Sequence, residues 1–302
     1  FDYPYPKAVS VSAEDQGMEY PMICWNYGRP DETGFISDRT KYGMLGVIIH
    51  EVGHNFFPMI VNSDERQWTW MDEGLNTFLE YLAETTFDPN FPATRGPAKN
   101  IVPYMKGNQQ YLEPIMSNSE NIYNFGANAY GKPATGLNIL RETIMGHELF
   151  DHAFKTYANR WKFKHPTPEY FFRTMEDASA VDLDWFWRGW FYSTDFTDIA
   201  IKDVKQYYVV EQDPKDAKPQ FNRRGREIGD ENQPMLKMVL EGATDFKPEL
   251  ANGFDASKVQ ALNDYLSKNY TQAEISALQS PKFFYEVEFE KPGGLIMPII
   301  VE

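Results

Sequence analysis

Apolar residues recur at three- and four-residue spacing early in the chain, and this periodicity predicts an amphipathic helix. The stripe consists of Tyr42, Leu45, Ile49, Val52 and Phe56. Ser37 or Asp38 can cap the start of this helix, and Pro58 marks its end. Three glycines lie inside it, and each costs about 1 kcal/mol relative to alanine in a helix interior. We therefore expect close packing against a neighbouring element at Gly43, Gly46 and Gly53.

Further helices follow from the same kind of periodicity. One runs from about residue 71 to 86, and its buried stripe consists of Leu75, Phe78, Leu79 and Leu82. Later helical patterns cover residues 148–161, 168–178 and 185–192. The last of these is rich in aromatic residues, which we assign to the core.

Alternating residues predict strands at 7–13, 201–210 and 285–290, and a turn at 292–294 predicts a hairpin into a strand at 295–301. All seven tryptophans precede residue 191 and all five histidines precede residue 166, which indicates a boundary near residue 200. We expect an α+β protein: a mostly helical domain with an edge β-sheet at 1–200, then a β-rich segment at 201–302. That segment includes a long polar loop at 212–234 and short helices at 257–267 and from 271.

The first helix carries the sequence His50-Glu51-Val-Gly-His54. Each helical residue turns by about 100° and rises about 1.5 Å, so the two imidazoles lie roughly 40° and 6 Å apart on one face. Both can therefore reach one tetrahedral metal ion. Glu51 turns away from this pair, where it cannot be a ligand but can take a proton from a metal-activated water.

A third candidate ligand, Glu73, follows His54 by nineteen positions and opens the second helix. Two imidazoles and one carboxylate with an open fourth position are typical of a catalytic zinc site, so we expect one Zn²⁺. Glu80 points in the same direction as Glu73 because seven residues are close to two turns. It is expected either to orient a zinc histidine through its free ring nitrogen or to be a solvated glutamate.

The histidine pair with Glu73 resembles the motif of the gluzincin aminopeptidases, the group of aminopeptidase N and leukotriene hydrolase. A metzincin is excluded because Phe57 and Ile60 stand where that motif requires glycine and histidine. The resemblance implies a thermolysin-like catalytic domain, followed by the opening of a β-sandwich. It also implies a preceding domain of the same polypeptide, which this chain lacks.

Two other segments are similar to this family. Gly17-Met18-Glu19 resembles its Gly-x-Met-Glu-Asn signature, with Tyr20 replacing the asparagine and Gln16 the first glycine. The resemblance implies that the strand edge binds the peptide backbone and that Glu19 binds the substrate α-ammonium.

Tyr130 lies in a segment similar to the family's Tyr-x-Lys sequence, ahead of a helix with Pro133 in its first turn. The resemblance implies that Tyr130 stabilises the oxyanion, a task that suits a neutral phenol donor. Composition alone favours a core role for this residue, since the chain has 18 tyrosines.

A net charge of −15 argues against nucleic acid or anionic membranes as partners and favours cationic ligands such as a peptide amino terminus. Cys24 is alone, so an intramolecular disulfide is excluded, and we assign it to the core. No apolar run reaches the length of a membrane span, and nothing at the start resembles a signal peptide. We expect a processed or trimmed fragment. The sequence does not determine the cellular compartment of the protein, and export to the periplasm or the extracellular space is one option.

The sequence thus predicts a zinc-dependent aminopeptidase that hydrolyses amino-terminal peptide bonds. Glu51 and Tyr130 are its expected catalytic residues, and peptides with a free amino terminus are its expected substrates. A thermolysin-like endopeptidase is the alternative enzyme, since it uses the same zinc spacing. A non-catalytic peptide-binding protein with an inherited zinc site is the alternative outside enzymes.

Overall fold

The computed structural model describes residues 1–208, 267–268, 271–272, 283–291 and 293–297. The chain divides into two compact units, Phe1–Asp198 with Gly293–Glu302, and Ile199–Pro292. The first unit contains every candidate site residue, so its architecture is what matters for function. Among the described residues, no helix combines the length and the apolar character that crossing a membrane requires.

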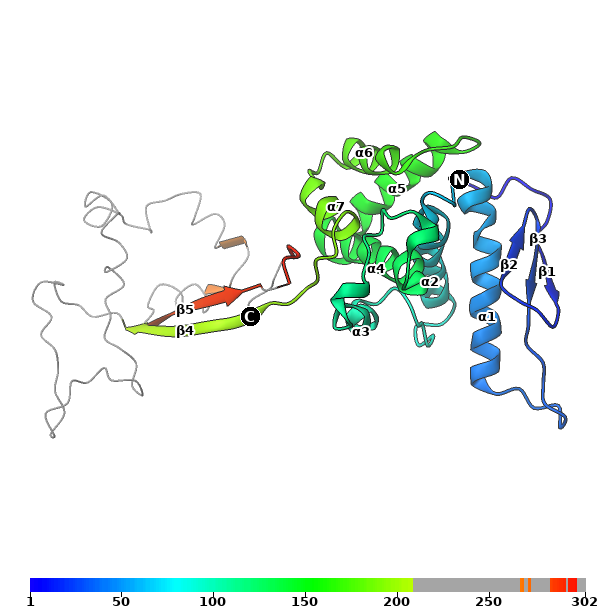
Figure 1. Cartoon of the computed structure of the whole chain (residues 1–302), viewed down its shortest axis with the longest axis horizontal. Helices are drawn as coiled ribbons and strands as arrows, with labels where there is room; N and C mark the ends of the chain where they lie inside the picture. Colours follow the sequence, from blue (N-terminus) through cyan, green and yellow to red (C-terminus); the bar gives the residue numbers. More distant parts are fainter. Residues whose placement is uncertain (209–266, 269–270, 273–282, 292, 298–302) are drawn as a thin grey trace, which may run out of the picture. The chain divides into compact units, whose positions relative to one another are not determined.

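A three-stranded sheet opens the first unit (Figure 1). Its strands are β1 (Val9–Ser12), β2 (Met18–Tyr20) and β3 (Ile23–Asn26), in the order β1-β3-β2. β1 runs parallel to β3, and β2 runs antiparallel to it. β2 is therefore an edge strand of this sheet, as the candidate peptide-binding role requires. Cys24 on β3 is 2% exposed, in agreement with its assignment to the core.

The helix α1 (Asp38–Gly53) lies beside this sheet and contacts β3 (Figure 1). It begins where the sequence indicated, because the Ser37 hydroxyl accepts a hydrogen bond of 3.1 Å from the backbone amide of Thr40. A π-helical turn, Trp70–Gly74, precedes α2 (Leu75–Phe87), which packs against α1. The two metal-binding patterns of the sequence thus lie on neighbouring helices.

The remaining helices of this unit enclose an aromatic core. They are α3 (Val102–Met105), α4 (Lys132–Ile139), α5 (His147–Trp161), α6 (Pro168–Ser179) and α7 (Asp184–Phe191). The core includes Trp70, Phe78, Phe154, Phe171, Trp187 and Trp190. The aromatic helix at 185–192 is therefore a core element, as its sequence predicted. Small sheets and a helical majority make the architecture α+β.

Close packing holds at two of the three α1 glycines. A Cβ at Gly53 would collide with the Asn76 side chain, and one at Gly46 would lie 3.2 Å from Glu84 Oε1. At Gly43, by contrast, nothing lies within 4 Å of the Cβ position. The expectation was wrong there because Gly43 is exposed and has open space at its Cβ position.

In the second unit, β4 (Ala200–Tyr208) pairs antiparallel with β5 (Phe283–Glu290). The predicted hairpin from β5 into residues 295–301 was wrong over the described part of that segment, where residues 295–297 are not a strand. Gly294 instead bridges to Phe196, and Leu295 is 2% exposed within the hydrophobic core of the first unit. Burial of this leucine competes with strand pairing. The predicted loop at 212–234 lies outside the described residues, as does nearly all of the helix at 257–267.

Candidate metal centre and active site

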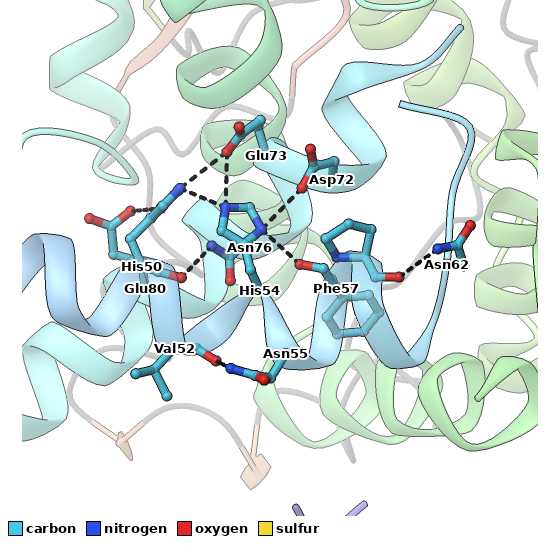
Figure 2. Close-up of polar contacts among 11 residues, drawn as sticks. His50, Val52, His54, Asn55, Phe57, Asn62, Asp72, Glu73, Asn76 and Glu80 are labelled. Atoms are coloured by element: carbon cyan, nitrogen blue, oxygen red, sulfur yellow. Dashed lines mark hydrogen bonds and ion pairs between the residues drawn. The ribbon is translucent and has the colours of Figure 1, made fainter. Parts of the chain in front are cut away.

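The site begins with two imidazoles on one face of α1 (Figure 2). The Nε2 atoms of His50 and His54 lie 3.0 Å apart. Glu73, from the π-helical turn before α2, places its Oε2 atom 3.1 Å from His50 Nε2 and 3.3 Å from His54 Nε2. The structure thus brings together the three residues that the sequence nominated as metal ligands.

The other nitrogen of each ring meets an oxygen acceptor (Figure 2). His50 Nδ1 lies 2.9 Å from Glu80 Oε2. His54 Nδ1 lies 2.9 Å from the Phe57 carbonyl oxygen and 3.0 Å from Asp72 Oδ1. Since these oxygens only accept, both Nδ1 atoms must carry hydrogen. In the neutral rings, both Nε2 lone pairs therefore point into the site.

This donor set fits a tetrahedral zinc ion. Two lone pairs and a carboxylate oxygen within 3.3 Å of one another repel unless a cation or protons lie between them. For zinc–nitrogen bonds of about 2.0–2.1 Å at tetrahedral angles, the ligand atoms lie roughly 3.3 Å apart. The observed separations of 3.0–3.3 Å agree with that spacing. The chemistry and the spacing of the residues thus both suit a divalent cation.

The charges around the site also favour a cation. Burial lowers the pKa of His54, but hydrogen bonds to Asp72 and Glu73 outweigh it and raise this pKa to about 11. Burial also lowers the pKa of His50, but hydrogen bonds to the Glu73 and Glu80 carboxylates outweigh it and raise this pKa to about 9. For Glu73 burial raises the pKa, but the two imidazoles outweigh it and hold the pKa far below its ordinary value.

Glu51 is buried beside the histidines, with 4% of its surface exposed. Its Oε2 atom has no hydrogen-bond partner among the described residues. Its Oε1 atom faces Gly17, where a Cβ would lie 3.9 Å away. Burial raises the pKa of Glu51 to about 7, although the nearby histidines oppose the shift. A carboxyl group with a free oxygen and a pKa near neutrality suits proton transfer.

The edge strand β2 brings Glu19 to the same place. Oxygen and nitrogen atoms of Glu19, His54 and Asp72 all lie within 4.8 Å of one another. Gly17, just before the strand, has φ +81°, a left-handed conformation that glycine adopts without strain. Met18 is 46% exposed. The segment nominated for substrate binding therefore borders the histidine pair.

Tyr130 reaches the site from a π-helical turn, Gly126–Gly131, just ahead of α4. Its ring stacks on that of His50 at a centroid distance of 5.9 Å. Burial, and next the Glu73 carboxylate, raise the pKa of Tyr130 well above its ordinary value, so the phenol stays protonated. Short π-helical turns inside helices are frequent at functional sites, and here they carry both Glu73 and Tyr130.

Close contacts hold these two turns together. A Cβ at Gly74 would lie 2.6 Å from Pro133 Cγ and 3.0 Å from the Ala129 carbonyl oxygen, so only glycine permits this approach. Behind them, Lys132 is 1% exposed and its Nζ donates to the Ser193 carbonyl at 3.2 Å. Trp190 Nε1 donates to the Lys132 carbonyl at 2.8 Å. The Tyr130 segment is therefore anchored to the aromatic core.

The domain model of peptidase family M1 matches residues 1–190, which is more than half of the 302 residues. The chain belongs to peptidase family M1. The matched part of the M1 chain contains the three-stranded sheet, His50, His54, Glu73 and Tyr130. The predicted resemblance to gluzincin aminopeptidases is thereby confirmed at the level of the family.

Individual relatives are distant from this M1 chain. Aminopeptidase M1-D of Oryza sativa subsp. japonica is 23% identical over 222 residues, which cover 70% of this chain and 25% of that protein. Aminopeptidase N of Lactococcus lactis subsp. lactis is 20% identical over 235 residues, with coverages of 70% and 27%. The chain thus spans about a quarter of the length of these relatives.

Among solved structures, the chain is similar in fold to an M1 zinc metallopeptidase from Deinococcus radiodurans, a variant bound to a Tyr-Ser-Ala substrate. The TM-score is 0.50 and the identity is 15%, over 65% of this chain and 41% of the other. At this identity the likeness concerns the fold.

Sequence reasoning missed three residues of the candidate site. Asp72 places its Oδ1 atom 3.0 Å from His54 Nδ1. Nothing in the sequence separates its role from that of the adjacent Glu73. Asn76 donates from Nδ2 to the His50 carbonyl at 2.8 Å, which joins α2 to the end of α1. Arg95 places its guanidinium carbon 4.3 Å from the centre of the Tyr130 ring. Asn76 follows Glu73 at helical spacing, which was a usable signal, whereas Arg95 lies in an irregular segment without one.

Proposed function

We propose that this chain carries the catalytic site of a zinc aminopeptidase, which removes amino-terminal residues from peptides. The observation that carries the proposal is the convergence of His50, His54 and Glu73, at tetrahedral spacing, beside an edge strand that bears Glu19. We expect a thermolysin-like catalytic arrangement with one Zn²⁺ ion.

Glu51 is the proposed general base and acid. When held by His50, His54 and Glu73, a zinc ion supplies Lewis-acid activation of water and of the scissile carbonyl. The Glu51 carboxylate accepts the proton of the attacking water and passes it to the departing amine. Its unpartnered Oε2 atom and its pKa of about 7 support this role, because a base works best near the operating pH.

Tyr130 is the proposed donor to the carbonyl oxygen as negative charge develops there. Its raised pKa keeps the hydroxyl protonated, and its stacking on His50 keeps the phenol within the site. The anchoring of the Tyr130 turn through Lys132 and Trp190 supports this role, since an oxyanion donor must be held in place before the reaction.

Glu19 and the edge of β2 are the proposed substrate-binding elements. An extended peptide pairs with the free edge of the strand, and the Glu19 carboxylate receives the α-ammonium group. Gly17 and Met18 provide the backbone and an exposed apolar surface at this edge. An acidic group at this distance from the metal ligands favours exopeptidase activity over endopeptidase activity.

Glu51→Gln tests the chemistry, because glutamine keeps the size of the side chain and loses its basicity. We expect zinc content to stay at the level of the unmodified chain and kcat on an aminoacyl chromogenic substrate to fall roughly 10²- to 10⁴-fold. Glu142→Gln, an exposed glutamate paired with His147, is the control and should keep full activity. Undiminished turnover of Glu51→Gln would remove Glu51 from the mechanism.

Free and N-acetylated forms of one peptide test the exopeptidase assignment. We expect only the free form to be cleaved efficiently, since acetylation removes the charge that Glu19 binds. Glu19→Gln should narrow the difference between the two forms. Equal cleavage of both would instead support the thermolysin-like endopeptidase, and zinc binding without any cleavage would support the non-catalytic alternative.

A further inference from the structure

Arg95 brings a positive charge into the candidate active site. Its guanidinium carbon lies 4.3 Å from the centre of the Tyr130 ring, a distance at which a cation is attracted by the aromatic face. The Tyr130 ring in turn lies 5.9 Å from that of His50. Arg95 is therefore one aromatic ring away from the proposed metal ligands, although it takes no part in the chemistry described above.

Within the part of the chain that the structure describes, Arg95 forms neither an ion pair nor a hydrogen bond to the protein. Arg141, by comparison, binds Asp151 through two hydrogen bonds of 2.7 and 3.1 Å. The chain has 44 acidic and 29 basic residues, so an arginine without a carboxylate partner is unexpected here. A guanidinium that lies over an aromatic face can still donate its N–H groups to a planar anion.

Arg95 is one of the residues that line a cavity of about 410 Å³. That volume lies in the range of ligand pockets, roughly 300–1,000 Å³. None of the described residues that line it is acidic, and Arg95 is the charged one among them. Its other polar lining residues are Thr94, Asn100, Tyr104, Asn124 and Thr135. A cationic group among neutral polar side chains suits an anion and rejects a second cation.

We propose that Arg95 binds a carboxylate of the peptide substrate, and that the enzyme therefore prefers peptides with an acidic group beyond the scissile bond. This inference rests on the proposed aminopeptidase function. The amino terminus is assigned to Glu19, and the proposal assigns the group that reaches Arg95, beside Tyr130, to the part of the peptide that leaves. Two sources supply such a carboxylate: an aspartate or glutamate side chain, or the free carboxyl terminus of a short peptide.

Matched peptides with a common amino-terminal alanine test the proposal. Ala-Glu-Ala-amide against Ala-Gln-Ala-amide probes a side-chain carboxylate, and Ala-Ala against Ala-Ala-amide probes a carboxyl terminus. The measured quantity is the ratio of kcat/KM within each pair, which cancels general effects of a substitution on folding or zinc content. We expect the acidic member to be preferred roughly tenfold in at least one pair, as a charge-assisted bidentate contact allows.

Arg95→Met should bring that ratio close to one, because methionine keeps much of the side-chain length and removes the charge. Arg95→Lys should retain part of the preference, since lysine keeps the charge and loses the planar fork. Lys99→Met removes one nearby exposed charge and should leave the ratio as in the unmodified chain. A uniform loss for all peptides in Arg95→Met, with an unchanged ratio, would overturn the proposal and assign Arg95 to the support of Tyr130.

Binding measurements separate this inference from the proposed function. Dissociation constants of the same peptides on the Glu51→Gln chain should show the same preference for the acidic members, and Arg95→Met in that background should abolish it. Absence of hydrolysis in the unmodified chain, with the binding preference intact, would refute the aminopeptidase and keep the carboxylate site. Hydrolysis without a preference for the acidic peptides, in kcat/KM and in the dissociation constants, would refute the carboxylate site alone.

Discussion

Asp72 offers the sharpest test of how this site holds a metal ion. Its Oδ1 atom lies 3.0 Å from His54 Nδ1, and the two side chains are 5% and 1% exposed. His54 Nδ1 donates its hydrogen bond to the Phe57 carbonyl, and the Asp72 carboxylate beside it increases the basicity of the ring that presents Nε2 to the metal. Asp72→Asn keeps the shape and an accepting oxygen but removes the negative charge.

The expected loss of zinc affinity is about tenfold, or ~1.4 kcal/mol. Partners of this kind are worth about 10- to 100-fold in metal affinity. We expect the lower end of that range because the Phe57 carbonyl, 2.9 Å from the same nitrogen, remains as an acceptor. Competition with a chromophoric chelator at constant pH measures the dissociation constant.

Glu142→Gln is the matched control for Asp72→Asn. It removes one charge from a carboxylate that contacts a histidine, since Glu142 Oε2 lies 2.7 Å from His147 Nε2 on the exposed surface. This variant should bind zinc as the unmodified chain does. Equal affinities of the Asp72 variant and this control would refute the reasoning, and so would an Asp72 variant that binds zinc more tightly.

Two further predictions concern the packing and the pH response of the first unit. Gly74→Ala places a Cβ 2.6 Å from Pro133 Cγ, so the Glu73 and Tyr130 turns must separate. We expect the free energy of unfolding, measured in urea titrations, to fall by about 1–3 kcal/mol, and zinc affinity to fall with it. Unchanged values would show that the contact relaxes freely. Burial raises the pKa of Glu84 to about 8, and neighbouring Glu80 adds to the shift. The folded chain then binds a proton that the unfolded chain has released above about pH 4.5, so stability falls as pH rises from about 4.5 to about 8. Glu84→Gln should remove about 2 kcal/mol of that fall in urea titrations at pH 5 and pH 8. Parallel pH curves of the two chains would contradict this account.

The sequence by itself determined the local part of this protein. The start of α1 follows from the Ser37 cap. The predicted end at Pro58 was wrong: α1 ends at Gly53, and Pro58 lies in a separate π-helical turn, Asn55–Ile60. The relative positions of His50, Glu51 and His54 follow from 3.6 residues per turn. The direction of Glu80 relative to Glu73 follows from the same period. These features depend on neighbours within two helical turns, whose geometry hardly varies between proteins.

Only the tertiary structure decided which distant groups meet. Asp72 reaches His54, the Arg95 guanidinium lies over the Tyr130 ring, and β5 pairs with β4 across more than 70 residues of chain. Leu295 enters the helical core although its own sequence favoured a strand. The reason is that such contacts depend on the paths of loops and on which groups compete for burial. The outcome of that competition is a sum of small free energies over the whole chain. A periodic pattern records which face of an element is apolar, and it carries no information about the partner that covers that face.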